Sequence, residues 1–260
     1  MIVQEIIQAI EDFAPLAYQE SYDNAGLLIG SPQQEITSAL LTIDVTPEVI
    51  DEAVTVGANC IIAHHPFIFS GLKHVRGEND VERCVVKAIQ YDIAIYAAHT
   101  NLDSVFYGVN YKIAQKLNLQ QLHILQPTEN NSHIGNGMIG CLEKSMPVRD
   151  FLEQVKQTFS CKFLKTSPLC NHVISRVSLC GGSGSFLIEQ AKKQKADVFL
   201  TADVKYHDFF SAENQIIIVD FGHYESEQFT KDIFYEILNK KFPTFALHFS
   251  KITTNPINYI

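Results

Sequence analysis

The sequence predicts an α/β fold built from two similar, duplicated βαβ-type lobes. Helical and strand-like patterns alternate along almost the whole chain of 260 residues, which is typical of strands joined by covering helices. The predicted strands are short, unbroken apolar runs, and such runs indicate strands that are buried on both faces. With 46% hydrophobic and 19% charged residues, the composition is that of an ordinary globular protein and excludes disordered, collagen-like and coiled-coil chains.

The first predicted lobe covers residues 1–125. Residues 2–13 carry apolar side chains at a helical spacing. Thr46 is a favourable N-cap and Pro47 a favourable first helical residue, so a second helix is expected to run from there to Gly57. The other elements expected in this lobe are strands at 26–30, 36–45, 59–63 and 93–98 and helices at 80–91 and 108–118.

The second predicted lobe covers residues 126–260. It starts with a stretch rich in Asn, Pro and Gly, which predicts a loop over residues 126–137. Its last helix is expected to be long and continuous, over residues 225–241. The other elements expected are strands at 137–142, 161–165, 177–180, 197–201, 216–221 and 245–250 and helices at 147–159, 185–196 and 207–214.

An internal similarity suggests that one lobe is a duplicate of the other. Residues 57–65 can be set against residues 195–203, and both follow a strand, a turn and a helix. In each half the next strand ends in a histidine that is followed four residues later by a carboxylate. These pairs are His99 with Asp103 and His223 with Glu227. Chance similarity between two βαβ units is the alternative interpretation.

Charge and composition narrow the classes of partner. The net charge of −9 predicts poor general binding to nucleic acid, because affinity for phosphates comes mostly from Lys and Arg. No apolar run approaches the roughly 18 residues that a membrane span needs. The N-terminus has acidic residues and no basic region or cleavage site, so it does not resemble a signal peptide. The six cysteines contain no C-x-x-C pair, and together these features predict a cytoplasmic protein with structural thiols.

The strongest local signal is the pair His64 and His65, directly after a buried strand. Ligands of α/β sheets bind at the carboxyl ends of the strands. Adjacent side chains of a strand point to opposite faces, so both histidines can serve one site only if the chain leaves the strand there. Pro66 favours this because it interrupts regular pairing. The alternative is one packed and one surface histidine.

Together the three strand ends predict a dinuclear metal site in the cleft between the lobes. Each end carries a histidine with a second histidine or a carboxylate, although Asp103 and Glu227 could each serve only as helix-capping acids. Imidazoles and carboxylates suit Zn, Mn, Fe, Co, Ni or Mg, which the residues do not distinguish. Three histidines and two carboxylates can hold two divalent ions if one carboxylate bridges them.

A glycine-rich turn is a candidate for binding substrate. Gly182, Ser183 and Gly184 lie between a strand and a helix, where backbone N–H groups can hold an anion. The alternative is a tight turn that allows close helix packing. Asp203, Tyr206 and His207 are further candidates to line the same cleft or to lie on the surface, and Asp44 to Thr46 are the counterpart of the glycine turn in the first half.

The motifs resemble those of the NGG-one-interacting-factor-three-like family, often described as type 2 GTP cyclohydrolase I homologues. The resemblance rests on YDNAGL, IDVTPEV, AHHPFIF, AAHTNLD, CGGSGS, TADVKYH and GHYESE, which occur in family order between residues 22 and 227. It implies a two-lobed α/β fold and a dinuclear metal site with Glu227 as the bridging carboxylate. The ligands that it implies are His64, His65, Asp103, His223 and Glu227.

The resemblance also implies an assembly and a function. Members are typically homohexameric rings, formed as trimers of dimers, and a chain of 260 residues is similar to the short form without an inserted domain. The expected function is metal-dependent hydrolysis, in which metal-activated water attacks a small, anionic, nucleotide-like substrate. His99 is then a candidate catalytic residue for proton transfer or support of the metal ligands. The alternative is a non-catalytic metal-binding scaffold or regulatory ring protein that binds a protein or nucleic-acid partner.

Overall fold

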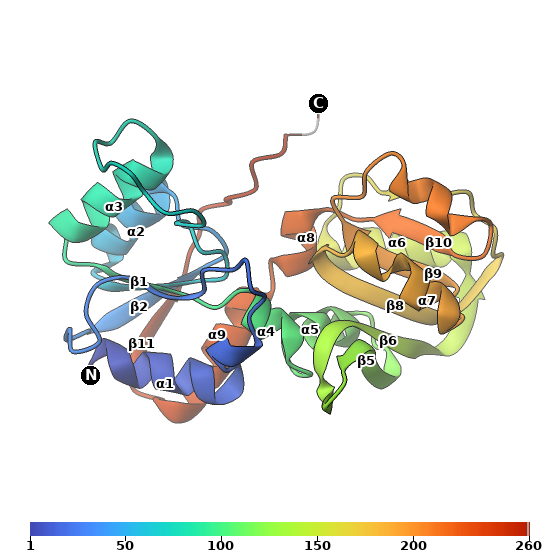
Figure 1. The fold of residues 1–260 in the computed structure, drawn as a ribbon, viewed down its shortest axis with the longest axis horizontal. Coiled ribbons are helices and arrows are strands. Elements are labelled where there is room, and N and C mark those ends of the chain that lie inside the picture. Colours follow the sequence, from blue (N-terminus) through green and yellow to red (C-terminus); the bar gives the residue numbers. More distant parts are fainter. Residues whose placement is uncertain (259) are drawn as a thin grey trace. The chain divides into compact units, whose positions relative to one another are not determined.

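The computed structural model describes residues 1–258 and 260, which form a mixed α/β fold with two β-sheets (Figure 1). The chain divides into two compact units. The first contains Met1–Leu102 and Thr230–Asn258, and the second contains Asp103–Phe229. The boundary predicted after residue 125 instead falls inside strand β5 (Gln120–Thr128). The C-terminal segment returns to the first unit, because its strand pairs with the edge of the first sheet.

The first unit contains a five-stranded sheet in the order β1-β4-β3-β2-β11. Four of its strands are parallel, and β1 runs antiparallel to β4. The three central strands are buried along their whole length, as their unbroken apolar sequences predict. The strands are β1 (Gly26–Ile29), β2 (Ser38–Thr42), β3 (Cys60–Ala63), β4 (Ala94–Ala97) and β11 (Ala246–Phe249).

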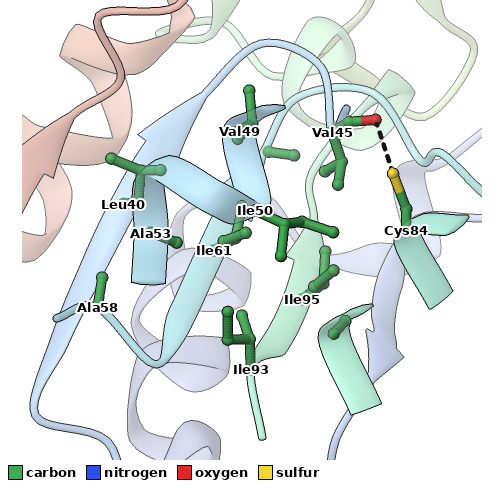
Figure 2. Packing of buried hydrophobic residues seen from close by; sticks show 12 residues of the cluster. Leu40, Val45, Val49, Ile50, Ala53, Ala58, Ile61, Cys84, Ile93 and Ile95 are labelled. Carbon is green, nitrogen blue, oxygen red and sulfur yellow. Dashed lines mark hydrogen bonds between the residues drawn. The ribbon is translucent and has the colours of Figure 1, made fainter. Parts of the chain in front are cut away.

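Helices cover both faces of this sheet. Figure 1 shows α2 and α3 over one face and α1 and α9 over the other. Figure 2 shows the core beneath α2 and α3, where Ile50, Ile61 and Ile95 pack together and the Cys84 thiol donates to the Val45 carbonyl at 3.8 Å. The helices are α1 (Val3–Phe13), α2 (Pro47–Val56), α3 (Asp80–Gln90) and α9 (Thr230–Lys241), with a 3-10 turn η1 (Leu16–Tyr18).

Local sequence sets both ends of α2, as predicted. The Thr46 hydroxyl accepts a hydrogen bond from the Val49 N–H at 3.3 Å, and Pro47 occupies the first helical position. The helix ends at Gly57, whose φ of 73° is in the left-handed region that glycine adopts without strain.

This cap gives a small, specific stability prediction. We expect Thr46→Ala to lower the free energy of unfolding by about 1 kcal/mol, because it removes the acceptor for one N–H of the first turn. Thr55→Ala is the matched control, since Thr55 is an exposed threonine of the same helix. It should change stability by less than about 0.5 kcal/mol, because Ala is the better helix former. Urea unfolding measures both, and equal losses would contradict the capping role.

The second unit contains a six-stranded sheet in the order β5-β6-β8-β9-β10-β7. Strands β8, β9 and β10 are parallel, and β5, β6 and β7 pair antiparallel with their neighbours. The loop predicted over residues 126–137 is wrong, because most of it belongs to the hairpin of β5 and β6. The strands are β5 (Gln120–Thr128), β6 (Asn131–Pro147), β7 (Lys165–Thr166), β8 (Val173–Ser183), β9 (Val198–Ala202) and β10 (Ile217–Asp220).

The helices of the second unit differ from prediction at one important place. The helix expected over residues 225–241 is two helices, α8 (His223–Glu227) and α9, and α8 belongs to the second unit whereas α9 belongs to the first. The remaining helices are α5 (Val109–Lys116), α6 (Val148–Phe159), α7 (Ile188–Lys193) and the 3-10 turns η2 (Ser185–Leu187) and η3 (Asp208–Ala212). A short helix, α4 (Thr100–Ser104), contains the boundary between the units.

Both sheets bring polar residues to the carboxyl ends of their parallel strands. In the first, His64 follows β3 and His99 follows β4 closely. In the second, Asp203 follows β9 and His223 lies beyond β10. These are the ends where α/β sheets bind ligands. Among the described residues, no helix has the length and apolar character needed to cross a membrane.

Candidate metal centre

The backbone after β3 explains how two adjacent histidines can serve one site. The N–H groups of His64 and His65 both donate to the Ile43 carbonyl, at 3.1 and 2.9 Å. Two consecutive N–H groups that share one acceptor cannot continue a regular ladder, in which neighbouring groups point to opposite sides. The chain therefore leaves the strand after Ala63, as the sequence requires for a shared site.

Three imidazoles of the first unit form one cluster. The ring centroids of His64 and His65 lie 4.8 Å apart, and each is 5.3 Å from the ring of His99. One nitrogen from each ring lies within 4.8 Å of the others, so the cluster could hold a metal ion. His99, expected as a proton-transfer or supporting residue, therefore lies among the residues that could bind metal directly.

Each of these rings is held through the same nitrogen. Nδ1 of His65 donates to the Asp44 carboxylate at 2.7 Å, and Nδ1 of His99 donates to the Asp23 carboxylate at 2.8 Å. Nδ1 of the fully buried His64 donates to the Ala98 carbonyl at 2.9 Å. The acceptors cannot donate, so the proton is on Nδ1 and Nε2 is the nitrogen suited to a metal. This arrangement is the one that accompanies metal-binding histidines.

Both supporting carboxylates of the first unit are held in the ionised form. Burial raises the pKa of Asp23, but hydrogen bonds from His99 and Thr100 outweigh it and lower the pKa to about 2. Burial likewise raises the pKa of Asp44, and the hydrogen bond from His65 outweighs it, so the net pKa is below the ordinary value. Ionised acceptors strengthen the hold on each imidazole and raise its basicity towards a metal.

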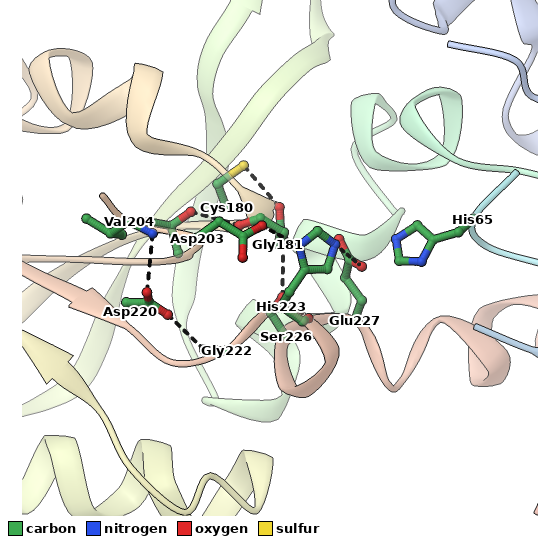
Figure 3. A network of polar contacts seen from close by, with 12 residues as sticks. His65, Cys180, Gly181, Asp203, Val204, Asp220, Gly222, His223, Ser226 and Glu227 are labelled. Atoms are coloured by element: carbon green, nitrogen blue, oxygen red, sulfur yellow. Dashed lines mark hydrogen bonds and ion pairs between the residues drawn. The ribbon is translucent and has the colours of Figure 1, made fainter. Parts of the chain in front are cut away.

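In the second unit, His223 lies between two carboxylates, as Figure 3 shows. Its Nδ1 lies 2.6 Å from Asp203, and its Nε2 lies 3.0 Å from Glu227. His223 and Glu227 are four residues apart on α8, a spacing that places two side chains on the same helical face. Burial lowers the pKa of His223, but the hydrogen bonds to Asp203 and Glu227 outweigh it and raise the pKa to about 11.

A second carboxylate, Asp103, belongs to the same unit as Glu227. Burial raises the pKa of the Cys180 thiol, and the negative charges of Asp103 and Glu227 raise it further. Glu227 is only 3% exposed. The His223 imidazole, 3.0 Å away, stabilises the Glu227 carboxylate, and a divalent ion would do the same. The donor chemistry of His223 and Glu227 therefore fits a metal, whereas Asp103 is in none of the ligand groups found among the described residues.

The glycine-rich segment packs against these acids. Gly182 has a φ of 61°, and a Cβ built there would lie 2.4 Å from the Glu227 carboxylate. The N–H of Gly182 donates to the Ser226 hydroxyl and the N–H of Gly181 donates to Asn110, each at 2.9 Å. These contacts favour the packing interpretation of the turn. Gly182 and Ser183 end β8, and Gly184 follows as the N-cap of the 3-10 turn η2, which continues directly into α7, so the segment lies between a strand and a helix.

Of the other candidates, one lies in this site and two lie on the surface. Asp203 contacts His223, whereas Tyr206 and His207 are exposed and contact each other, with ring centroids 5.2 Å apart. Tyr206 lines a separate cavity of about 490 Å³ together with Phe209 and Phe210. All six cysteines are free thiols. As expected of structural thiols, most are buried, and the buried ones are Cys60, Cys84, Cys161 and Cys180.

Sequence reasoning missed the partners that hold the histidines. The sequence identifies Asp44 only as the counterpart of the glycine turn and Asp23 only as part of a family motif. Asp44 follows β2 closely, so the rule that found His64 could have found it. Asp23 lies in a loop before β1, and no pattern in the sequence connects it with His99.

Comparisons with known proteins agree with the fold. A sequence profile of the family described as Duf34/NIF3 (NGG1p interacting factor 3) matches residues 1–256. A Clostridium perfringens protein is 36% identical over 229 residues, which is 87% of each chain. A Clostridium acetobutylicum protein is 32% identical over 230 residues, 86% of this chain and 85% of its own. Both bear the name "GTP cyclohydrolase 1 type 2 homolog".

A solved structure, of a Bacillus cereus protein related to NIF3, is also similar. It superposes with a TM-score of 0.91 at 27% identity, over 100% of this chain and 99% of that one. A Bacillus subtilis relative is 26% identical to this chain. The alignment has 367 positions and covers 99% of this chain. That alignment is longer than this chain of 260 residues, so the relative contains additional residues, as expected of a longer form.

Proposed function

This chain belongs to the Duf34/NIF3 family, and we propose that it is a metal-dependent hydrolase that uses two divalent ions. One observation carries the proposal: Nδ1 of each of four histidines, His64, His65, His99 and His223, lies at hydrogen-bond distance from a carboxylate or carbonyl oxygen. Histidines packed for structure alone do not need one shared orientation. Metal ligands do, because the same nitrogen must be left for the ion.

We propose that two divalent ions would be held by His64, His65, Asp103, His223 and Glu227, the ligands that the family resemblance implies, with Glu227 as the shared carboxylate. Such a pair of ions lowers the pKa of bound water and stabilises negative charge on the substrate. The donor types support this assignment, because imidazole nitrogens and carboxylate oxygens are both common ligands of divalent metals.

The chain's other residues would orient these ligands and move protons. Asp44 and Asp203 fix the imidazoles of His65 and His223 by accepting from Nδ1. His99, held by Asp23, is suited to carry a proton to or from the substrate or to act as a further ligand. The names of the relatives support an anionic, nucleotide-like substrate.

We further propose that the two units arose by duplication. In each sheet three parallel strands follow in chain order, β2-β3-β4 and β8-β9-β10, and an antiparallel strand borders the last of them. A histidine with its Nδ1 beside an aspartate stands beyond the third strand of each set, as His99 with Asp23 and His223 with Asp203. The added hairpin β5-β6 and the returning strand β11 account for the differences.

Metal removal tests the hydrolase proposal. Protein loaded with Mn or Zn should hydrolyse at least one member of a panel of nucleoside triphosphates, phosphomonoesters, phosphodiesters and amides, followed by release of phosphate, formate or ammonia. Chelation should lower the rate by about 100-fold or more, and added metal should restore it, because the nucleophile depends on the ion. Folded, metal-loaded protein that turns over nothing in the panel would contradict the proposal and favour the scaffold alternative.

A further inference from the structure

The C-terminal segment after β11 is anchored to the first unit at two places. At the first, the Ser250 N–H donates to the Leu41 carbonyl at 2.9 Å, and the Lys251 N–H donates to the Glu52 carboxylate at 2.8 Å. The Ser250 hydroxyl donates to the same carboxylate. These bonds fix the direction in which the segment leaves the sheet, although it has no regular secondary structure.

At the second place, the segment reaches the support of a histidine. The Thr254 hydroxyl donates to Oδ2 of Asp44, and Oδ1 of Asp44 accepts from Nδ1 of His65 at 2.7 Å. A hydroxyl, a carboxylate and an imidazole are thus connected in series. Thr254 and Asp44 are 210 positions apart in the sequence, so only the fold brings them together.

The same arrangement occurs a second time in this unit. Asp23 accepts from Nδ1 of His99 with one oxygen at 2.8 Å, and its other oxygen accepts from the Thr100 hydroxyl and from the Thr100 N–H at 3.1 Å. In both cases a threonine hydroxyl binds the carboxylate oxygen that the imidazole does not use. A hydrogen bond to either carboxylate oxygen opposes rotation about χ2, so bonds to both oxygens hold the orientation more firmly than a bond to one.

We propose that Thr254 is a positioning residue, which orients Asp44 so that His65 presents Nε2 for metal binding. The inference rests on the proposed function, because it assigns a purpose to a residue outside the ligand set. The side chain of Asp44 is 33% exposed, so water competes for it once the hydroxyl is removed. The carboxylate then populates other rotamers, and the His65 ring loses its single orientation and tautomer.

Three variants test this role. Thr254→Val removes the hydroxyl and keeps the shape, and Thr254→Ser keeps the hydroxyl. Thr253→Val is the matched control, because Thr253 is the exposed neighbour in the same segment. Thermal unfolding of each metal-free variant establishes that the fold is retained.

The first measurement is the ¹⁵N spectrum of the histidine rings in metal-free protein at mildly alkaline pH. Wild-type protein, Thr254→Ser and Thr253→Val should show His65 protonated at Nδ1. Thr254→Val should show a mixture of the two tautomers. An unchanged His65 tautomer in Thr254→Val would overturn the inference, whether or not the protein binds metal.

The second measurement is the Zn dissociation constant by competition with a chelating dye. Loss of a group that directly supports a metal-binding histidine weakens binding by about 10- to 100-fold. Thr254 acts through Asp44, so Thr254→Val should weaken binding by about three- to tenfold, with Thr253→Val and Thr254→Ser close to wild type. Equal affinity of Thr254→Val and wild type would overturn the inference and leave the proposed function intact. Absence of metal binding by wild type would instead defeat the proposed function, and the spectrum would still decide the role of Thr254.

Discussion

Glu227→Gln is expected to reduce bound metal from about two ions per chain to about one and to lower hydrolysis by about 100-fold or more. Glu227 is the proposed shared ligand, and the substitution removes its charge while keeping its size. The carboxylate is 3% exposed and lies 3.0 Å from Nε2 of His223. A neutral amide there is a poor ligand for a divalent ion. Metal analysis of protein reconstituted with Zn or Mn gives the first value, and the substrate panel gives the second.

Glu225→Gln is the control for this substitution. Glu225 is on the same helix and is also buried, but residues two apart on a helix do not face each other, so Glu225 is on a different face from His223. Its carboxylate lies 2.2 Å from a Cβ built on Gly222. Glu225→Gln should therefore keep its metal, even if it lowers the unfolding temperature. Equal metal content in the two variants would show that Glu227 is not a shared ligand.

Gly182→Ala is expected to have the second largest effect, through both stability and metal content. The φ of 61° places the residue in the left-handed region, which costs a residue with a Cβ about 1–2 kcal/mol. The new Cβ would also lie 2.4 Å from the Glu227 carboxylate, so that flexible side chain must move away from its position beside His223. We expect a loss of about 1–3 kcal/mol in the free energy of unfolding and a weaker hold on metal.

Gly57→Ala separates these two effects. Gly57 has a φ of 73°, but within the described part of the chain no heavy atom lies within 4 Å of a Cβ built there. This variant should lose about 1–2 kcal/mol of stability from the backbone alone and keep its full metal content. Urea unfolding and metal analysis of both variants make the comparison. If Gly182→Ala retains as much metal as Gly57→Ala, the close packing of Gly182 on Glu227 has no bearing on the site.

Much of the fold could be predicted because it depends on local patterns. The apolar run of β3 and the capped start of α2 at Thr46 each depend on only a few adjacent residues. The hairpin of β5 and β6 was missed because its sequence is polar and rich in glycine, and much of it is exposed. Gly135 and Gly137 both have positive φ values, so residues that usually mark a loop are here irregular positions within a strand.

The break between α8 and α9 could not be predicted. The residues around Gln228 have helical spacing, and no proline or glycine marks an end there. The helix stops because the chain passes from the second unit to the first at Thr230. That is a property of the tertiary structure, so the predicted continuous helix over residues 225–241 was wrong.

The candidate site, like the fold, has residues that the sequence predicts and partners that it does not. His64, His65, His99 and His223 could be proposed as site residues because they follow strand ends, and the sequence periodicity shows where strands end. Their partners are different, because Asp23 reaches His99 and Thr254 reaches Asp44 from distant parts of the chain. A single sequence contains no record of such contacts, so the orientation of each imidazole becomes known only from the fold.

The central claim is that these histidines and carboxylates hold a pair of metal ions. The most direct test is the metal content of folded wild-type protein after incubation with Zn or Mn and removal of loosely bound ions. We expect about two ions per chain at full loading. Well-folded protein that retains no metal under these conditions would contradict the claim.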